Sequence, residues 1–128
     1  MNTKCKIAIA AVAGAALGAA AIQGLHAQAK PKAYTVAELQ VLDAAALATY
    51  VPAVLTAQRA AGGHPYNTGG GRMVAMEGAP PPMRVAITEW DSLEEAEAFY
   101  KSKAWLDLAP QRDKADKTIR RYTVEAAN

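Results

Sequence analysis

Six segments with a regular hydrophobic period follow one another between residues 34 and 125, and their order constrains the fold more than any other feature. A period of two residues indicates a strand, and a period of three to four indicates an amphipathic helix. The predicted order is strand, helix, strand, strand, helix, strand. Two split βαβ units in this order form a ferredoxin-like α+β plait, in which helices cover one face of a four-stranded antiparallel sheet.

The four predicted strands are separated by clear turn and helix signals. They cover residues 34–41, 72–78, 83–90 and 119–125. The sequence APPP at 79–82 lies between the second and third strands and is predicted to be a connection, because proline cannot donate to a central strand ladder. No internal repeat or second domain is visible, so one domain over residues 30–128 is expected.

The predicted helices have recognisable ends. The first begins after Asp43, a favourable N-cap, and stops at Gly62-Gly63. Pro52 falls inside it, and we expect a kink rather than a break because the apolar face stays in phase across the proline. The second helix begins at Ser92 with the S-x-x-E pattern of a capping box, and Ser102 is a candidate cap for a further short helix.

Residues 1–29 are predicted to be a secretory signal peptide rather than part of the fold. Two lysines precede an uncharged apolar run from Ile7 to Ile22, and the following Ala27-Gln28-Ala29 presents the small residues that a signal peptidase reads. A retained membrane anchor is the alternative, but a spanning helix needs about 20 apolar residues. We therefore expect cleavage near Ala29, no stable membrane anchor afterwards, and a periplasmic or secreted domain.

The domain left after cleavage carries no net charge and no cysteine. Its 12 basic residues are matched by 12 acidic ones, and Cys5 lies in the signal region. A neutral domain gives no electrostatic reason to expect nucleic acid as a partner. A single remaining histidine gives no metal-ligand spacing, and no cofactor motif is present, so neither a metal nor a cofactor is expected.

Three of the predicted strands are apolar on both faces. Since helices cover only one face of such a sheet, the other face would be exposed and apolar, which usually indicates a partner. A symmetric homodimer is the commonest solution. Two sheets packed face to face would form an α/β barrel. The residues that carry this argument are Tyr34, Val36, Leu39, Val85, Ile87, Trp90, Ile119, Tyr122 and Val124.

Several short motifs resemble the secreted bacterial branch of the domain-of-unknown-function 1330 family. They are AAGG at 60–63, MEGAPPPMRVAI at 76–87, SLEEAEAFYKSKAW at 92–105 and RYTVEA at 121–126. The resemblance runs from about Tyr34 to Ala126, and it implies a ferredoxin-like fold and a dimeric α/β barrel but no established reaction. The broader superfamily of such barrels includes cofactor-independent monooxygenases, haem-degrading enzymes, small isomerases and binding modules, so the fold does not settle the function.

The ligand-binding candidates centre on the third predicted strand. If Val85 and Ile87 pack on the helices, the side chains of opposite parity face the cavity between two subunits. There an arginine and an indole could hold a small aromatic acid. The alternative is that the arginine pairs across the dimer and the indole fills the interface. The candidates are Arg84, Trp90, Thr88 and, at the start of the second strand, Arg72.

A glycine-rich segment, residues 60–78, contains the one histidine outside the N-terminal region. Its glycines lie between a helix and a strand, which is the reverse of the order in a phosphate-binding loop, so a mobile loop is the simpler interpretation. His64 could still transfer protons near neutral pH. Together with Glu89 and Tyr34 it forms the set of candidate catalytic residues.

Three functions remain open for this domain. It could bind a small organic ligand in the dimer cavity, it could be a cofactor-independent enzyme of the monooxygenase or isomerase kind in the same cavity, or it could be a purely structural oligomerisation module. A roomy cavity favours the first function. A polar group with a strongly shifted pKa in that cavity favours the second, and a dry interface without a cavity favours the third.

Overall fold

Regular structure runs from Ala33 to Glu125 in the computed structural model, which describes residues 29–127. The predicted signal peptide lies outside the described residues, apart from Ala29 at its end. None of the helices between residues 29 and 127 has both the length and the apolar character needed to cross a bilayer. The elements are β1 (Ala33–Val41), α2 (Ala44–Ala60), β2 (His64–Pro65), β3 (Arg84–Trp90), α3 (Leu93–Lys101), α4 (Lys103–Leu106), α5 (Ala109–Ala115) and β4 (Asp116–Glu125).

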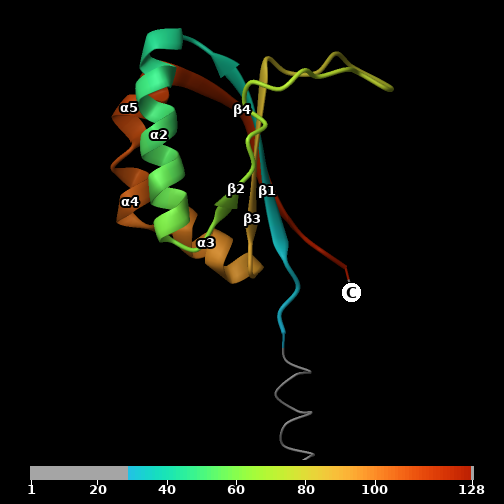
Figure 1. Cartoon of the computed structure of the whole chain (residues 1–128), viewed down its shortest axis with the longest axis vertical. Coiled ribbons are helices and arrows are strands. Elements are labelled where there is room, and N and C mark those ends of the chain that lie inside the picture. Colours follow the sequence, from blue (N-terminus) through green and yellow to red (C-terminus); the bar gives the residue numbers. More distant parts are fainter. Residues whose placement is uncertain (1–28, 128) are drawn as a thin grey trace, which may run out of the picture. The chain divides into compact units, whose positions relative to one another are not determined.

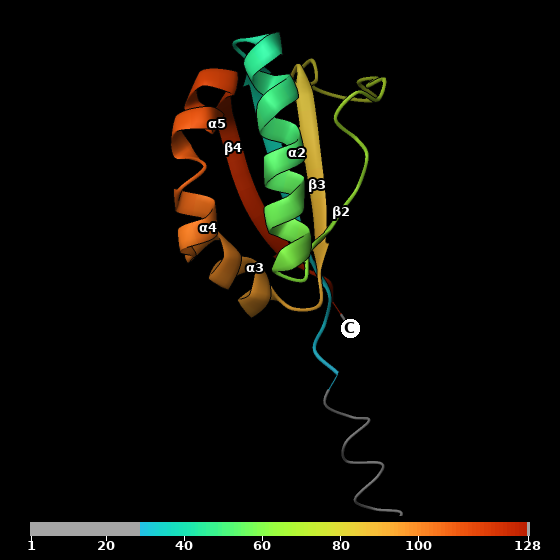
Figure 2. The same cartoon turned by 60° about the vertical axis from the view of Figure 1, so that its left-hand side comes forward.

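The four strands form one antiparallel sheet in the order β2-β3-β1-β4. At its centre Ala37 of β1 lies opposite Ala86 of β3 on one side and Arg121 of β4 on the other. All the helices lie on one face of the sheet, as Figure 1 and the turned view in Figure 2 both show. The predicted ferredoxin-like α+β fold is confirmed.

Local sequence signals explain where α2 begins and ends. The Asp43 carboxylate accepts a hydrogen bond of 2.9 Å from the Ala46 backbone N–H, which would otherwise lack a partner in the first turn. Pro52 lies inside a single continuous helix, so the chain does not break there, as expected. Gly62, just past the helix, has a φ of +88°, a conformation that glycine adopts without steric penalty.

Two serine caps shape the second helical region. Ser92 Oγ accepts from the Glu95 backbone N–H at 3.2 Å, and Ser102 Oγ accepts from the Trp105 N–H at 3.3 Å. Pro110 lies in the first turn of α5, where its missing N–H would have no helical partner in any case. Both predicted serine caps are confirmed, and the chain makes three short helices here instead of one long one.

The predicted strand over residues 72–78 is wrong. That segment has no regular structure and is exposed, and β2 is instead the two-residue strand His64–Pro65, which pairs with Glu89 and Thr88 of β3. The edge of β3 is already occupied further along, because the Tyr66 N–H donates to the Ile87 carbonyl at 2.9 Å. Residues 70–82 then extend away from the sheet (Figure 1).

The parity assumed for β3 is also wrong. The residues of β1 that face the helices alternate as Ala33, Thr35, Ala37 and Leu39 and are all buried. Antiparallel pairing puts Trp90 opposite Ala33 and Thr88 opposite Thr35, so these two side chains face the helices. Val85 and Ile87 therefore lie on the other face of the sheet, because side chains alternate along a strand.

The core is an aromatic cluster at one end of the helical layer. Trp90 is fully buried, and its ring lies 5.3 Å from that of Phe99, which in turn lies 5.7 Å from Trp105. Within the described residues no helix covers the opposite face of the sheet, and Tyr122 and Val124 remain about half exposed there. We call this surface the open face; its apolar members are Tyr34, Val36, Val85, Ile87, Tyr122 and Val124.

Candidate functional site

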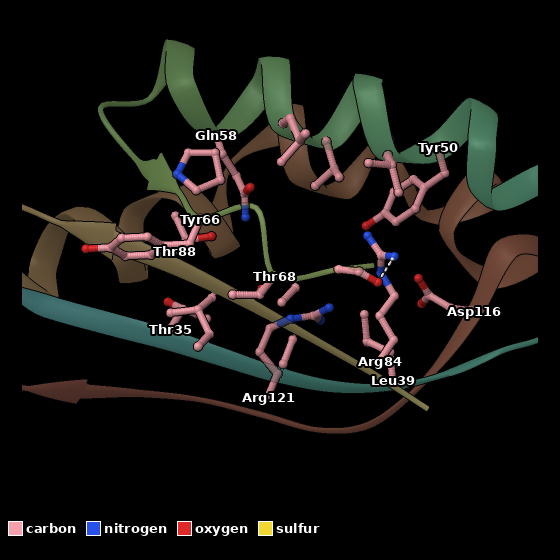
Figure 3. Close-up of a pocket in the computed structure, with 18 of the residues that line it drawn as sticks. Thr35, Leu39, Tyr50, Gln58, Tyr66, Thr68, Arg84, Thr88, Asp116 and Arg121 are labelled. Carbon is pink, nitrogen blue, oxygen red and sulfur yellow. Dashed lines mark hydrogen bonds between the residues drawn. The ribbon is translucent and has the colours of Figure 1, made fainter. Parts of the chain in front are cut away.

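A pocket of about 380 Å³ lies between α2 and the sheet, inside one copy of the chain. This volume falls within the range of small-molecule sites in proteins. The apolar side of α2 forms its roof, and the helix-facing side of the sheet forms its floor (Figure 3). The roof consists of Leu47, Tyr50, Val51, Val54, Leu55, Gln58 and Arg59, and the floor includes Thr35, Ala37, Leu39, Ala86 and Thr88.

Small side chains on the floor explain why the space stays open. Ala37 pairs directly with Ala86, and Thr35 pairs with Thr88, so two adjacent rows of the sheet present little volume to α2. Trp90 and Phe99 pack in the core under α3 and α4 instead of filling the gap, and Tyr100 and Trp105 line one wall of the pocket. As a result, the aliphatic roof residues of α2 are only half-buried, although they point at the sheet; they are Leu47, Val51, Val54 and Leu55.

Two arginines enter the pocket from opposite sides of β1. Arg84 of β3 pairs with Leu39, and Arg121 of β4 pairs with Ala37, so both side chains rise from the helix-facing side of the sheet (Figure 3). The Arg121 guanidinium lies 4.7 Å from the centre of the Trp105 ring and 5.6 Å from that of Tyr100, which is cation–π geometry. One end of the pocket is therefore basic.

A buried carboxyl group, Asp116, also lines the basic end. Only 4% of Asp116 is exposed, and its Oδ1 atom has no hydrogen-bond partner. Burial raises the pKa of Asp116, an effect that the positive charges of Arg121 and Arg84 oppose without cancelling. Burial, with the charge of Asp116 as the next cause, raises the pKa of Tyr50 to about 12, so the phenol stays neutral. A perturbed acid inside a pocket is typical of functional sites.

One side of the pocket is closed by the segment Tyr66–Gly69, which we call the strap. Thr68 Oγ donates to the Val85 carbonyl at 2.9 Å, adding to the backbone bond from Tyr66. At the end of the strap the Gly69 carbonyl accepts a hydrogen bond of 2.6 Å from Arg84 Nη1. The strap thus fixes the position of one of the two pocket arginines.

The ligand-binding candidates from the sequence separate into two groups. Arg84 and Thr88 do line a cavity, but it lies within one chain and not between two subunits. Trp90 belongs to the core, where its indole N–H donates to Thr35 Oγ1 at 3.1 Å. Arg72 is exposed in the irregular segment beyond the strap and does not line the pocket.

The candidate catalytic residues are brought together, although away from the pocket. Strand pairing places His64 opposite Glu89, and Glu89 opposite Tyr34, in one row on the open face. Lys32 Nζ lies 2.7 Å from a Glu89 oxygen, and the Tyr66 hydroxyl donates to the other at 2.7 Å. These two partners hold the pKa of Glu89 below its usual value, so Glu89 is a paired carboxylate rather than a poised acid.

Sequence reasoning assigned no site role to three pocket residues: Tyr50, Asp116 and Arg121. Tyr50 was part of an apolar helix face, and Asp116 lay ahead of the predicted fourth strand, which begins three residues earlier than expected. The pairing of β4 with β1 supplies the missing information, because it places Arg121 beside Ala37 on the helix side. No cluster of three metal-ligating side chains occurs between residues 29 and 127.

Comparison with known proteins places the chain in a family. The family model described as "Domain of unknown function (DUF1330)" matches residues 32–126. The chain belongs to the DUF1330 family. This membership confirms the resemblance inferred from the motifs, and comparison with curated proteins finds no match.

Solved structures similar to this DUF1330 chain support the fold. RPA0582, a protein of unknown function from Rhodopseudomonas palustris, is 13% identical with a TM-score of 0.56, over 83% of this chain and 89% of that one. SnoaB, a cofactor-independent oxygenase from Streptomyces nogalater, is 12% identical with a TM-score of 0.51, over 77% of this chain and 95% of that one. At such low identity these likenesses establish the fold alone.

Proposed function

We propose that this DUF1330 chain binds a small organic ligand in the pocket between α2 and the sheet. The observation that carries the proposal is the pocket itself, with an apolar roof, a floor of small residues and a few convergent polar groups. This combination is typical of sites for small molecules, in which apolar walls give affinity and polar groups give orientation.

The half-buried side chains of α2 support this proposal. Leu47, Val51 and Val54 face the sheet across the pocket, and each leaves part of its apolar surface exposed there. An apolar ligand would remove that surface from water, at about 25 cal/mol of stabilisation per Å². A purely structural oligomerisation module would not need an open pocket between α2 and the sheet.

A pocket-filling variant tests the proposal. We expect several members of a panel of small aromatic acids and alcohols to bind the purified protein, as detected by ligand-observed NMR. Ala86→Phe would occupy the floor and abolish this binding, whereas Ala98→Phe, on the exposed side of α3, would leave it unchanged. Wild-type binding in Ala86→Phe, or no binding by any compound to the wild type, would contradict the proposal.

A second candidate function, a cofactor-independent enzyme, is favoured by one observation. Asp116 is a buried acid with a raised pKa at the wall of the pocket, and such a group can accept or donate a proton during catalysis. SnoaB shares the fold and is an oxygenase. Mass spectrometry of panel compounds after incubation with the protein separates the two functions, because a binding protein returns every compound unchanged.

We further propose that the protein is exported and acts as a homodimer. Residues 1–29 have the composition of a signal peptide, and the open face leaves Tyr122 and Val124 about half exposed beside its other apolar side chains. A second copy of the sheet would cover this face and give the α/β barrel. Export is tested by the N-terminal sequence of protein recovered from the periplasm or medium, which we expect to begin at Lys30.

A further inference from the structure

We propose that the ligand of the pocket is a monoanionic organic acid, with its acidic group between Arg84 and Arg121 and its apolar body under α2. The proposal rests on the proposed function, because it names the chemical class of the ligand for the same pocket. It is carried by the charges of the lining, by the placement of the two guanidinium groups and by the position of Asp116.

The lining of the pocket carries an excess of positive charge. Among the described residues that line it, three are arginines, Arg59, Arg84 and Arg121, and one is a carboxylate, Asp116. Walls of low dielectric constant strengthen the field inside a cleft, so an excess of one sign attracts a ligand of the opposite sign. An anion is therefore favoured over a neutral or cationic molecule of the same shape.

The Arg121 guanidinium has unused hydrogen-bonding capacity. It stacks on the rings of Trp105 and Tyr100, and stacking occupies the faces of the planar group but leaves its N–H donors at the edge. Between residues 29 and 127, no acceptor forms a hydrogen bond or an ion pair with these donors. A carboxylate accepts two parallel N–H bonds from such an edge, which is a strong and directional arrangement.

The Arg84 guanidinium is held in place before any ligand arrives. Its Nη1 atom donates to the Gly69 carbonyl of the strap at 2.6 Å, while its remaining N–H groups are not used by that bond. Figure 3 shows its side chain extending upward from the sheet toward Tyr50. Because this side chain is already ordered, less entropy is lost when a ligand binds it.

Asp116 limits the charge of the ligand to a single negative charge. Its carboxyl group lies at the same end of the pocket, pointing toward Arg84 in Figure 3, and it makes no ion pair within the described residues. When ionised, Asp116 offsets part of the field of the arginines and repels a second negative charge on the ligand. A dianion such as a phosphate monoester is thus disfavoured, and a carboxylate fits the remaining field.

Matched probes that differ only in charge test the inference. We expect 3-phenylpropionate to bind the purified wild-type protein at least about tenfold more tightly than the neutral 3-phenylpropanamide, since hydrogen bonds to charged groups are the stronger ones. The preference should weaken as salt is added. Isothermal titration calorimetry at pH 7 measures both dissociation constants.

Arginine variants identify where the charge is recognised. Arg84→Gln and Arg121→Gln should each reduce the preference for the carboxylate several-fold, while Arg72→Gln, at an exposed arginine outside the pocket, should keep it. Because Arg121→Gln removes stacking in the core, near-UV circular dichroism should be used to check that this variant is folded. The comparison of carboxylate and amide binding to the wild-type protein does not depend on any variant.

The possible results separate the inference from the proposed function. If the amide binds as tightly as the carboxylate and Ala86→Phe removes both, the pocket binds ligands but the inference about charge is overturned. If neither probe binds, and no member of the wider panel does, the proposed function fails as well. A preference for the carboxylate that survives both pocket arginine variants would also overturn the inference.

Discussion

Gly69 lies so close to Arg84 that the Gly69 carbonyl accepts a hydrogen bond of 2.6 Å from Arg84 Nη1, and a Cβ atom at position 69 would overlap the guanidinium group. The absence of a side chain is therefore what allows the strap to hold this arginine at the pocket. The glycine-rich segment has a local role that is unrelated to phosphate binding.

The contact between Gly69 and Arg84 predicts the effect of a single methyl group. Gly69→Ala should displace the guanidinium and weaken the binding of 3-phenylpropionate by about fivefold, the equivalent of about 1 kcal/mol. Gly70→Ala is the matched control, because a Cβ at position 70 meets no atom within 4 Å. Calorimetry on both variants measures the effect, and equal affinity in the two would show that the position of Arg84 does not matter for binding.

Trp90 should act through stability and not through ligand binding. Its side chain is fully buried among the core aromatics, so Trp90→Ala should lower the free energy of unfolding by about 3–5 kcal/mol in urea denaturation. Leu106→Ala, at a leucine that is 59% exposed, should change it by less than about 0.5 kcal/mol. Near-normal stability of Trp90→Ala would mean that Trp90 lines a cavity, as the sequence interpretation had it.

Asp116 should make the stability of the protein depend on pH in an identifiable way. Burial raises its pKa in the folded protein above the unfolded value of 3.8, so the folded state holds the proton more tightly. The stabilisation from this proton is complete below pH 3.8 and is lost as the pH rises through the folded pKa.

The variant Asp116→Asn tests this linkage. Asn is neutral at every pH, so we expect the variant to be more stable than the wild type at pH 7 and to lose this advantage near pH 3.5. Urea denaturation at the two pH values measures the difference.

Asp113→Asn, at an exposed carboxylate, is the control, and its free energy of unfolding should stay within about 0.5 kcal/mol of the wild-type value at both pH values. A loss of stability at pH 7 in Asp116→Asn would mean that the nearby arginines outweigh burial.

Helix boundaries could be predicted because their causes are local. Asp43, Ser92 and Ser102 each cap a backbone N–H three residues along the chain, and the sequence contains everything that this interaction needs. The ferredoxin-like fold class could be predicted from the order of elements along the chain, since two βαβ units leave few possible topologies.

The pocket could not be located from the sequence, because its position depends on parity. Both faces of β3 carry apolar side chains, so alternation alone cannot say whether Ile87 or Trp90 faces the helices. The pairing of Trp90 with Ala33 shows that Trp90 faces the helices. An error of one residue in the assumed parity of β3 moves the whole candidate site to the wrong side of the sheet. The wrong strand prediction at 72–78 likewise depends on contacts between distant parts of the chain. Hydrogen bonds from Tyr66 and Thr68 of the strap occupy the edge of β3 with which the predicted strand would have paired.

The open face leads to a prediction about assembly. Val124 of β4 is 52% exposed and lies opposite Tyr34 on the open face. In a homodimer formed through this face a lysine at position 124 would be buried without a partner, so Val124→Lys should give a monomer. Leu106→Lys, on the helical side and similarly exposed, should remain dimeric like the wild type. Size-exclusion chromatography with light scattering measures these masses. A dimer that persists in Val124→Lys would place the interface elsewhere, and a monomeric wild type would leave the open face to another partner.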